Sequence, residues 1–187
     1  MTLKLSKDRK KTVNAIDKIA CRRYTAIFPD AEKSSDTEDM YDHVDYWHVR
    51  DGERFGVDIK GNKLPNELWI EFQNVQGNPG WLYGKAKWIA FEIPELNGFA
   101  MVERQHLKAW AEFNIDLNDK VSDSRDAYKR VYTRSQWGGY DGKPQRDLIS
   151  KITIHDLREL DGFTVAKYRS KYWHPGKKQW VTVDDKE

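Results

Sequence analysis

The 187-residue chain lacks several features that mark whole classes of protein. It has one cysteine, Cys21, so no disulfide can form within the chain, and we expect a reducing compartment. No apolar run approaches the roughly 20 residues of a membrane-spanning helix. The N-terminal residues also lack the apolar core of a signal peptide. We therefore expect a cytoplasmic protein with no membrane partner.

A strong net charge is also missing, because 32 Lys and Arg oppose 30 Asp and Glu for a formal charge of +2. The charges are unevenly spread, however. Residues 1–23 carry eight basic side chains against two acids, whereas residues 30–45 carry seven acids against one lysine. Residues 129–146 and 167–180 carry five basic side chains each. This distribution suits a protein that holds a polyanion and binds a cation, with ordinary charge scatter as the alternative.

Aromatic residues, by contrast, are abundant, with eight Trp in the chain. A disordered chain would lack them, and the length suits one domain with a real core. We expect a single α/β domain over residues 1–187, a central mixed β-sheet flanked by helices. The core would span about 8–113, and about 118–187 would form a basic, aromatic C-terminal extension.

Hydrophobic periodicity predicts the order of the elements. Residues 8–28 read as an amphipathic helix that ends before Pro29, and three strands follow near 43–49, 54–60 and 67–73. Asp51-Gly52 is typical of a two-residue hairpin turn between the first two strands. Further along, the pattern predicts a short helix or turn at 81–87, strands at 88–93 and 99–102, a helix at 103–113, a loop-like basic stretch at 118–147, and late strands at 152–155 and 163–166 around a helical turn at 156–160.

Each of the first three strands carries an acid among apolar neighbours. Alternation puts Asp58 and Lys60 on one face of the second strand, and Glu71 and Gln73 on one face of the third. If the turn at 61–66 pairs these strands, Asp58 lies opposite Glu71, and a divalent cation would relieve the repulsion. Asp45 on the first strand is a candidate third ligand. One acid-x-lysine taken alone is usually a solvated edge pair.

This combination favours phosphodiester chemistry. A divalent cation held by Asp45, Asp58 and Glu71 would polarise a phosphodiester and activate water. Lys60 could orient the water or stabilise developing charge, and Gln73 could position water or phosphate through hydrogen bonds.

With Asp45, Asp58-Ile-Lys60 and Glu71-Phe-Gln73 after a helix, the chain resembles the PD-(D/E)XK, or restriction-endonuclease-like, nuclease superfamily. The resemblance covers residues 8–113 and implies cleavage of nucleic acid, with DNA as the first expectation, in the presence of Mg²⁺ or Mn²⁺. Asp17 would be the optional helix acid. No proline precedes Asp45, and the register stays open, since Glu71-x-Gln73 could instead fill the acid-x-lysine position.

Other residues could contact nucleic acid. Residues 129–146 alternate basic side chains, which can bind phosphates, with aromatic side chains, which can stack on bases. Residues 168–178 have the same character. The aromatic residues of this second stretch could equally complete the core. The candidate phosphate contacts are Lys85, Lys87, Lys129, Arg130, Arg134, Lys143 and Arg146. His43 and His48 would face opposite ways in a strand, which disfavours a zinc site. Asp42 would point away from Asp45 and could belong to a turn.

The function that we expect is therefore a divalent-metal-dependent endo- or exonuclease, with nucleic acid as its partner and a homodimer as a possible assembly. A catalytically inactive nucleic-acid-binding or protein-interaction module on the same fold is the alternative. A basic inhibitor of another factor has no positive feature in the sequence.

Overall fold

The computed structural model describes residues 2–133, 135–136, 145–168, 171–174 and 179–182, with side chains for 15–133 and 147–168. The elements follow one another as α1 Thr2–Ile27, β1 Glu32–Lys33, η1 Glu38–Asp42, β2 Tyr46–Arg50, β3 Glu53–Lys60, β4 Leu68–Gln73, η2 Trp81–Tyr83, β5 Trp88–Ile93, η3 Pro94–Leu96, β6 Gly98–Glu103, α2 Arg104–Asn114, β7 Asp116–Val121, η4 Ser124–Asp126, β8 Arg130–Tyr132, β9 Ser135–Gln136, β10 Gln145–Arg146, β11 Leu148–Ile152, α3 Ile154–Arg158, β12 Thr164–Lys167, β13 Lys171–His174 and β14 Gln179–Thr182.

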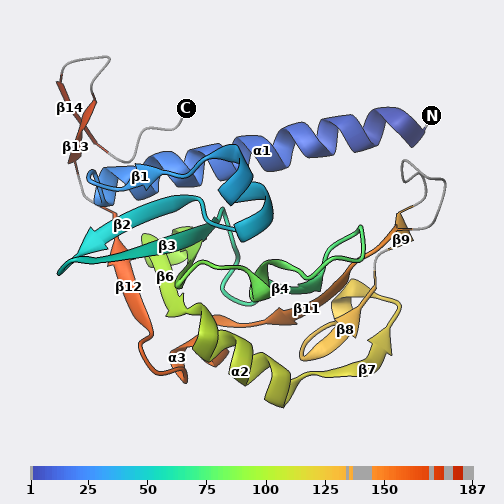
Figure 1. Cartoon of the computed structure of the whole chain (residues 1–187). Coiled ribbons are helices and arrows are strands. Elements are labelled where there is room, and N and C mark those ends of the chain that lie inside the picture. Colours follow the sequence, from blue (N-terminus) through green and yellow to red (C-terminus); the bar gives the residue numbers. More distant parts are fainter. Residues whose placement is uncertain (1, 134, 137–144, 169–170, 175–178, 183–187) are drawn as a thin grey trace.

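Two mixed sheets organise this α/β fold. The first has the order β1-β2-β3-β5-β6-β12, with β3 and β5 parallel and the other neighbours antiparallel. The second has the order β4-β11-β8-β7, with only β7 and β8 parallel. Short two-stranded pairs join β9 with β10 and β13 with β14. Figure 1 shows α1 on one side of the sheets and α2 on the opposite side.

The helix α1 packs on the first sheet through its apolar stripe. Ala20 and Tyr24 are fully buried, and they share a cluster with Val57 and Ile59 of β3 and with Phe99 of β6. The helix ends at Ile27, two residues before a proline, as expected where an X-Pro bond disfavours helical backbone. The opposite face of the first sheet, together with the second sheet, α2 and α3, encloses a larger apolar core.

Most local predictions agree with this structure, but the strand expected at 152–155 ends at Ile152, and α3 begins at Ile154. The three strands, the helix near 103–113 and the strands at 88–93 and 99–102 are confirmed within a few residues. Asp51 and Gly52 connect β2 and β3 with φ values of 54° and 80°, so both turn residues occupy the left-handed region that a tight two-residue hairpin requires. Leu107 and Ala111 of α2 point inward and are fully buried.

The pairing between strands differs from the prediction. β3 does not pair with β4, and Asp58 does not lie opposite Glu71, because β3 pairs in parallel with β5 while β4 crosses to the second sheet and pairs with β11. The single central sheet is thus replaced by two. The apolar face of β4 (Leu68, Ile70 and Phe72) is buried in the core between the sheets. The free energy gained by this burial favours the second sheet, although the short connection between β3 and β4 would have allowed a hairpin.

The stretch at 118–147 is not simply a loop, because β7, η4 and β8 lie within it. β11 pairs with β4, and β12 pairs with β6. Strands from the expected C-terminal extension therefore complete both sheets, and the core reaches past residue 113. Among the described residues, no helix is both long and apolar enough to cross a membrane.

Candidate functional site

Two carboxylates face each other at the start of β2 and near the end of β3. The antiparallel register pairs Tyr46 with Val57, so the next position places Asp45 opposite Asp58. The Asp45 backbone N–H donates to Val57 O at 2.8 Å, and Asp45 Oδ2 accepts from the Ile59 N–H at 2.6 Å. The like-charge juxtaposition expected between Asp58 and Glu71 is therefore formed by Asp45 and Asp58 instead. Like charges directly opposite each other disfavour an antiparallel pair.

Lys60 completes this group from the same face of β3. Its Nζ lies 2.7 Å from Asp58 Oδ2 and 4.9 Å from the centre of the Trp81 ring. Asp58 is only 3% exposed, and its Oδ2 has no aligned hydrogen-bond donor, so the contact with Lys60 is an ion pair without hydrogen-bond geometry. Asp58 and Lys60 therefore lie together on one face of β3, as strand alternation predicts.

Burial changes the acidity of this cluster. Loss of solvent, followed by the charge of Asp58, raises the pKa of Asp45 to about 7. Burial also raises the pKa of Asp58, although the Lys60 ammonium opposes that effect. For Lys60, burial alone would lower the pKa, but attraction to Asp58, Asp45 and Glu71 raises it overall. A cation beside the two carboxylates would relieve the cost of ionising them.

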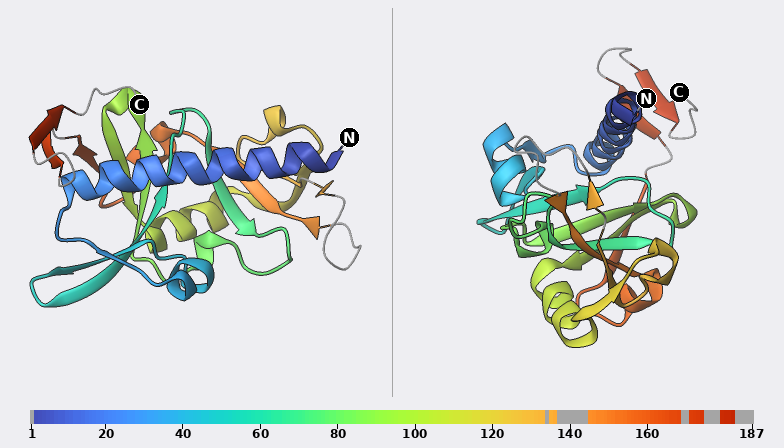
Figure 2. Two further views of the ribbon diagram at one scale, coloured as in Figure 1. Left: turned by 90° about the horizontal axis from the view of Figure 1, so that it is seen from above. Right: turned by 90° about the vertical axis from the view of Figure 1, so that its right-hand side faces the viewer.

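The cluster lies at the wall of a cleft of about 740 Å³, which we call the α1 cleft. Its wall residues come from α1, from the segment between α1 and β2, and from β2 and β3; they are Asp17, Lys18, Cys21, Arg22, Thr25, Lys33, Asp36, Asp39, His43, Asp45, Tyr46, Asp58, Ile59 and Lys60. Figure 2 shows α1 and η1 standing on the same side of the first sheet. The reactive groups are therefore reached between a helix and a sheet.

Glu71 belongs to the other sheet but stays within electrostatic range of the cluster. Its charge contributes to the raised pKa of Lys60, and its Oε2 accepts from the Trp81 N–H at 3.4 Å. The backbone of Gly80 approaches Glu71 so closely that a Cβ added at Gly80 would overlap the Glu71 backbone oxygen. Glu71 does not line the α1 cleft.

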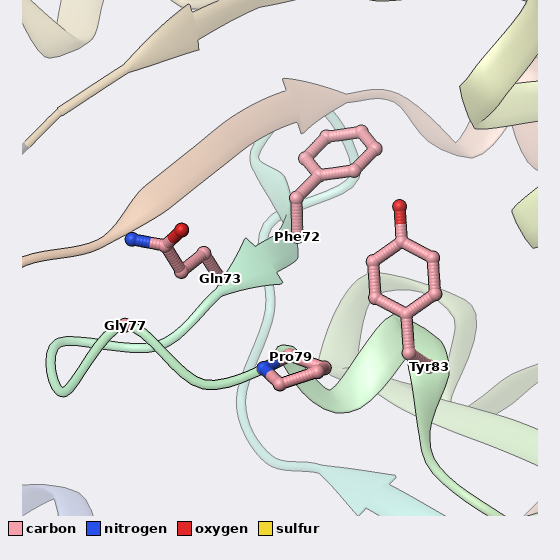
Figure 3. A pocket seen from close by; sticks show the side chains of 5 residues that line it. All are labelled: Phe72, Gln73, Gly77, Pro79 and Tyr83. Atoms are coloured by element: carbon pink, nitrogen blue, oxygen red, sulfur yellow. The ribbon is translucent and has the colours of Figure 1, made fainter.

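Gln73 lies apart from the carboxylates. It lines a different cavity of about 340 Å³, together with Phe72, Gly77, Pro79 and Tyr83. Figure 3 shows its amide at the end of β4, directed away from the Tyr83 ring. The expectation that Gln73 lies on one hairpin face with Asp58 and Lys60 is wrong, because β3 pairs with β5 and β4 pairs with β11.

The four described candidates for phosphate contacts each pair with an acid. The distances from their nitrogens to a carboxylate oxygen are 2.9 Å for Lys85 with Asp42, 2.9 Å for Lys87 with Glu53, 2.8 Å for Lys129 with Asp156 and 2.7 Å for Arg130 with Asp119. None of these cations lines the α1 cleft. Arg134 and Lys143 lie outside the described residues, as does the side chain of Arg146.

The two histidines make separate contacts, although His43 follows η1 and lies outside β2, so strand alternation does not place it. His48 Nε2 lies 2.8 Å from the Tyr24 hydroxyl and its ring stacks on Phe55, whereas His43 lines the α1 cleft. Burial, then the charge of Lys60, lowers the pKa of His43. Asp42 belongs to the η1 turn and pairs with Lys85. Over the described part of the chain, no group of three or more His, Cys, Asp or Glu is close enough to hold a metal ion.

Several residues of the site escaped the sequence argument. Trp81 lies beside the Lys60 ammonium. Arg104 of α2 donates to Ala86 O at 2.7 Å and to Leu82 O at 3.1 Å, and so ties η2 and the segment after it to α2. Lys18 and Arg22 were recognisable as a polar stripe of the N-terminal helix. Their position over the carboxylates depends on how α1 crosses the sheet.

Comparison of the chain with protein-family models, with curated proteins and with solved structures finds no match.

Proposed function

We propose that this protein is a divalent-metal-dependent nuclease that hydrolyses phosphodiester bonds, with DNA as the expected substrate. The observation that carries the proposal is the meeting of Asp45, Asp58 and Lys60 on adjacent strands at the wall of the α1 cleft. The order of a helix, a strand acid and then acid-x-lysine agrees with the resemblance to the PD-(D/E)XK superfamily.

The residues present fit a hard divalent cation. Asp45 and Asp58 would hold it, since Mg²⁺ uses one or two carboxylates and keeps several waters. Asp58 Oδ2 is buried and lies 2.7 Å from the Lys60 ammonium, so positive charge is already favoured at this oxygen. When bound, such a cation polarises the phosphodiester and lowers the pKa of a water molecule. The third ligand expected from the sequence is Glu71, whose charge acts on Lys60 but which does not line the α1 cleft.

Lys60 has a separate role. Its ammonium stays charged at neutral pH, because attraction to Asp58 and Asp45 more than offsets the effect of burial on its pKa. It can therefore donate hydrogen bonds to a phosphate oxygen on which negative charge develops, at a site that excludes most water. The ammonium itself lies over the Trp81 ring at 4.9 Å from its centre, and this cation–π contact helps to hold it in place.

The test is cleavage of plasmid, single-stranded, branched and RNA substrates by the purified full-length protein with Mg²⁺, Mn²⁺ or EDTA. We expect metal-dependent cleavage that falls at least about 100-fold in both Asp58→Asn and Lys60→Gln. Asp51→Asn and Lys120→Gln are matched controls, because they make the same chemical changes at exposed positions outside the α1 cleft. Far-UV circular dichroism checks that each variant folds.

Two results would contradict the proposal. One is metal-independent cleavage that survives in Asp58→Asn. The other is binding of nucleic acid with no cleavage of any substrate, which would favour the inactive binding module instead.

A further inference from the structure

The α1 cleft also constrains the form of the substrate. Its floor includes Asp58, which is 3% exposed, and Lys60, whose side chain is 21% exposed. The residues that line the cleft around them come from α1, from the segment between α1 and β2, and from β2 and β3, so a scissile phosphate would approach through this cleft. The size of the cleft therefore bears on which nucleic acids can react.

The cleft is small compared with a duplex. Its volume of about 740 Å³ lies in the range of roughly 300 to 1,000 Å³ that is typical of pockets for one small molecule. A B-DNA duplex, whose major groove alone is about 12 Å wide, is far larger than such a ligand and could only lie over the mouth of the cleft. One or two unpaired nucleotides do fit, and enzymes that act on buried groups commonly take nucleotides out of the duplex.

One wall carries cations suited to a phosphate backbone. Lys18, Cys21, Arg22 and Thr25 recur at helical spacing on the face of α1 that lines the cleft, where Asp17 is the one acid that α1 contributes. Lys18 and Arg22 are exposed, and neither makes an ion pair with another side chain that the structure describes. Residues four apart on a helix are neighbours, so both ammonium and guanidinium can contact one strand. Such contacts would be independent of base sequence.

We propose that the α1 cleft binds unpaired, single-stranded nucleic acid, whose phosphates lie along Lys18 and Arg22 while the scissile phosphate reaches Asp58 and Lys60. This inference rests on the proposed nuclease function for the cleavage step, but the binding step stands independently. A paired end reacts only after its strands separate.

The test compares one labelled 30-nucleotide strand with its blunt duplex. With Mg²⁺ and the wild-type protein, we expect the single strand to be cleaved at least about tenfold faster than the duplex. Fluorescence anisotropy with Lys60→Gln, which keeps both carboxylates, measures binding without turnover. In that background, Lys18→Gln with Arg22→Gln should weaken single-strand binding about tenfold or more.

Salt dependence gives a readout that a structural defect would not reproduce. Each phosphate contact contributes about 0.7 to the slope of log affinity against log salt for a single strand, so losing two contacts should reduce the slope by about 1.4. Arg125→Gln is the matched control, because Arg125 is exposed and pairs only locally with Asp123 near η4. It should change neither affinity nor slope.

The outcomes separate the two proposals. Duplex cleavage as fast as single-strand cleavage, or an unchanged salt slope in the Lys18/Arg22 double variant, overturns the inference and leaves the nuclease function standing. Single-strand binding that depends on both cations without any cleavage supports the inference and overturns the nuclease function. Absence of single-strand binding overturns the inference.

Discussion

Replacing Asp45 with asparagine should stabilise the metal-free protein at alkaline pH. The asparagine amide would keep an oxygen that accepts from the Ile59 N–H, a hydrogen bond of 2.6 Å in the structure. The substitution would also remove a charge that is buried opposite Asp58. The variant thus tests whether Asp45 is held for its charge at a cost to folding.

The magnitude follows from the raised pKa of Asp45. That pKa is about 7 in the folded protein and 3.8 ordinarily, because of burial and then the charge of Asp58. At about 1.4 kcal/mol per pH unit, ionising Asp45 in the folded chain costs about 4 kcal/mol. The folded state holds a proton that the unfolded state has lost, so stability falls as the pH rises from about 4 to 7 and then levels.

The assay is urea unfolding in EDTA at pH 5 and at pH 8, for the wild type and Asp45→Asn. At pH 5 the unfolded chain has ionised Asp45 while the folded chain has not, so we expect a gain in the free energy of unfolding of only about 1 to 1.5 kcal/mol, less than half of the full effect. At pH 8 we expect a gain of about 2 to 4 kcal/mol. Added Mg²⁺ should stabilise the wild type at pH 8 and have much less effect on the variant, which lacks one of the two carboxylates.

Asp123→Asn is a control of opposite sign. The hydrogen bond from Arg125 lowers the pKa of Asp123 to about 2, so its favourable contribution exists above pH 3.8 and disappears as the pH falls through about 2. Asp123→Asn should therefore give no gain at pH 8. An equal gain for Asp45→Asn at both pH values, or none at either, would refute the reasoning about Asp45.

Three further predictions concern the frame around the site, each measured as the free energy of unfolding in urea. Glu92→Gln should cost about 2 kcal/mol, because the fully buried Glu92 accepts from Arg23 at 2.9 Å and the variant leaves that guanidinium without its ion pair; an unchanged midpoint would contradict this. Leu107→Ala should cost about 2 to 5 kcal/mol by leaving a cavity between α2 and the core; a loss below about 1 kcal/mol would mean that the helix collapses onto the space. Gly80→Ala should cost about 2 kcal/mol or more, since its Cβ would overlap the backbone oxygen of Glu71, and a neutral result would show that the loop moves freely.

Much of the local structure could be predicted because its causes lie within a few residues. Alternation along β3 places Asp58 and Lys60 on one face whatever the strand pairs with. The Asp51-Gly52 turn depends on two backbone conformations that these residues tolerate, and it fixes the register of β2 against β3. From that register alone, Asp45 and Asp58 could have been placed opposite each other.

The partners of β3 and β4 could not be predicted in the same way, because a strand's pattern identifies its apolar face and not its neighbour. Only the tertiary structure decided that β5 lies beside β3 and that β4 joins β11. That choice leaves Glu71 near Lys60 and moves Gln73 to another cavity. The amino-acid sequence by itself determined which strands carry the reactive groups and which face they occupy. The packing of α1 and the second sheet determined which of those groups meet, because burying apolar faces between distant segments is a property of the whole chain.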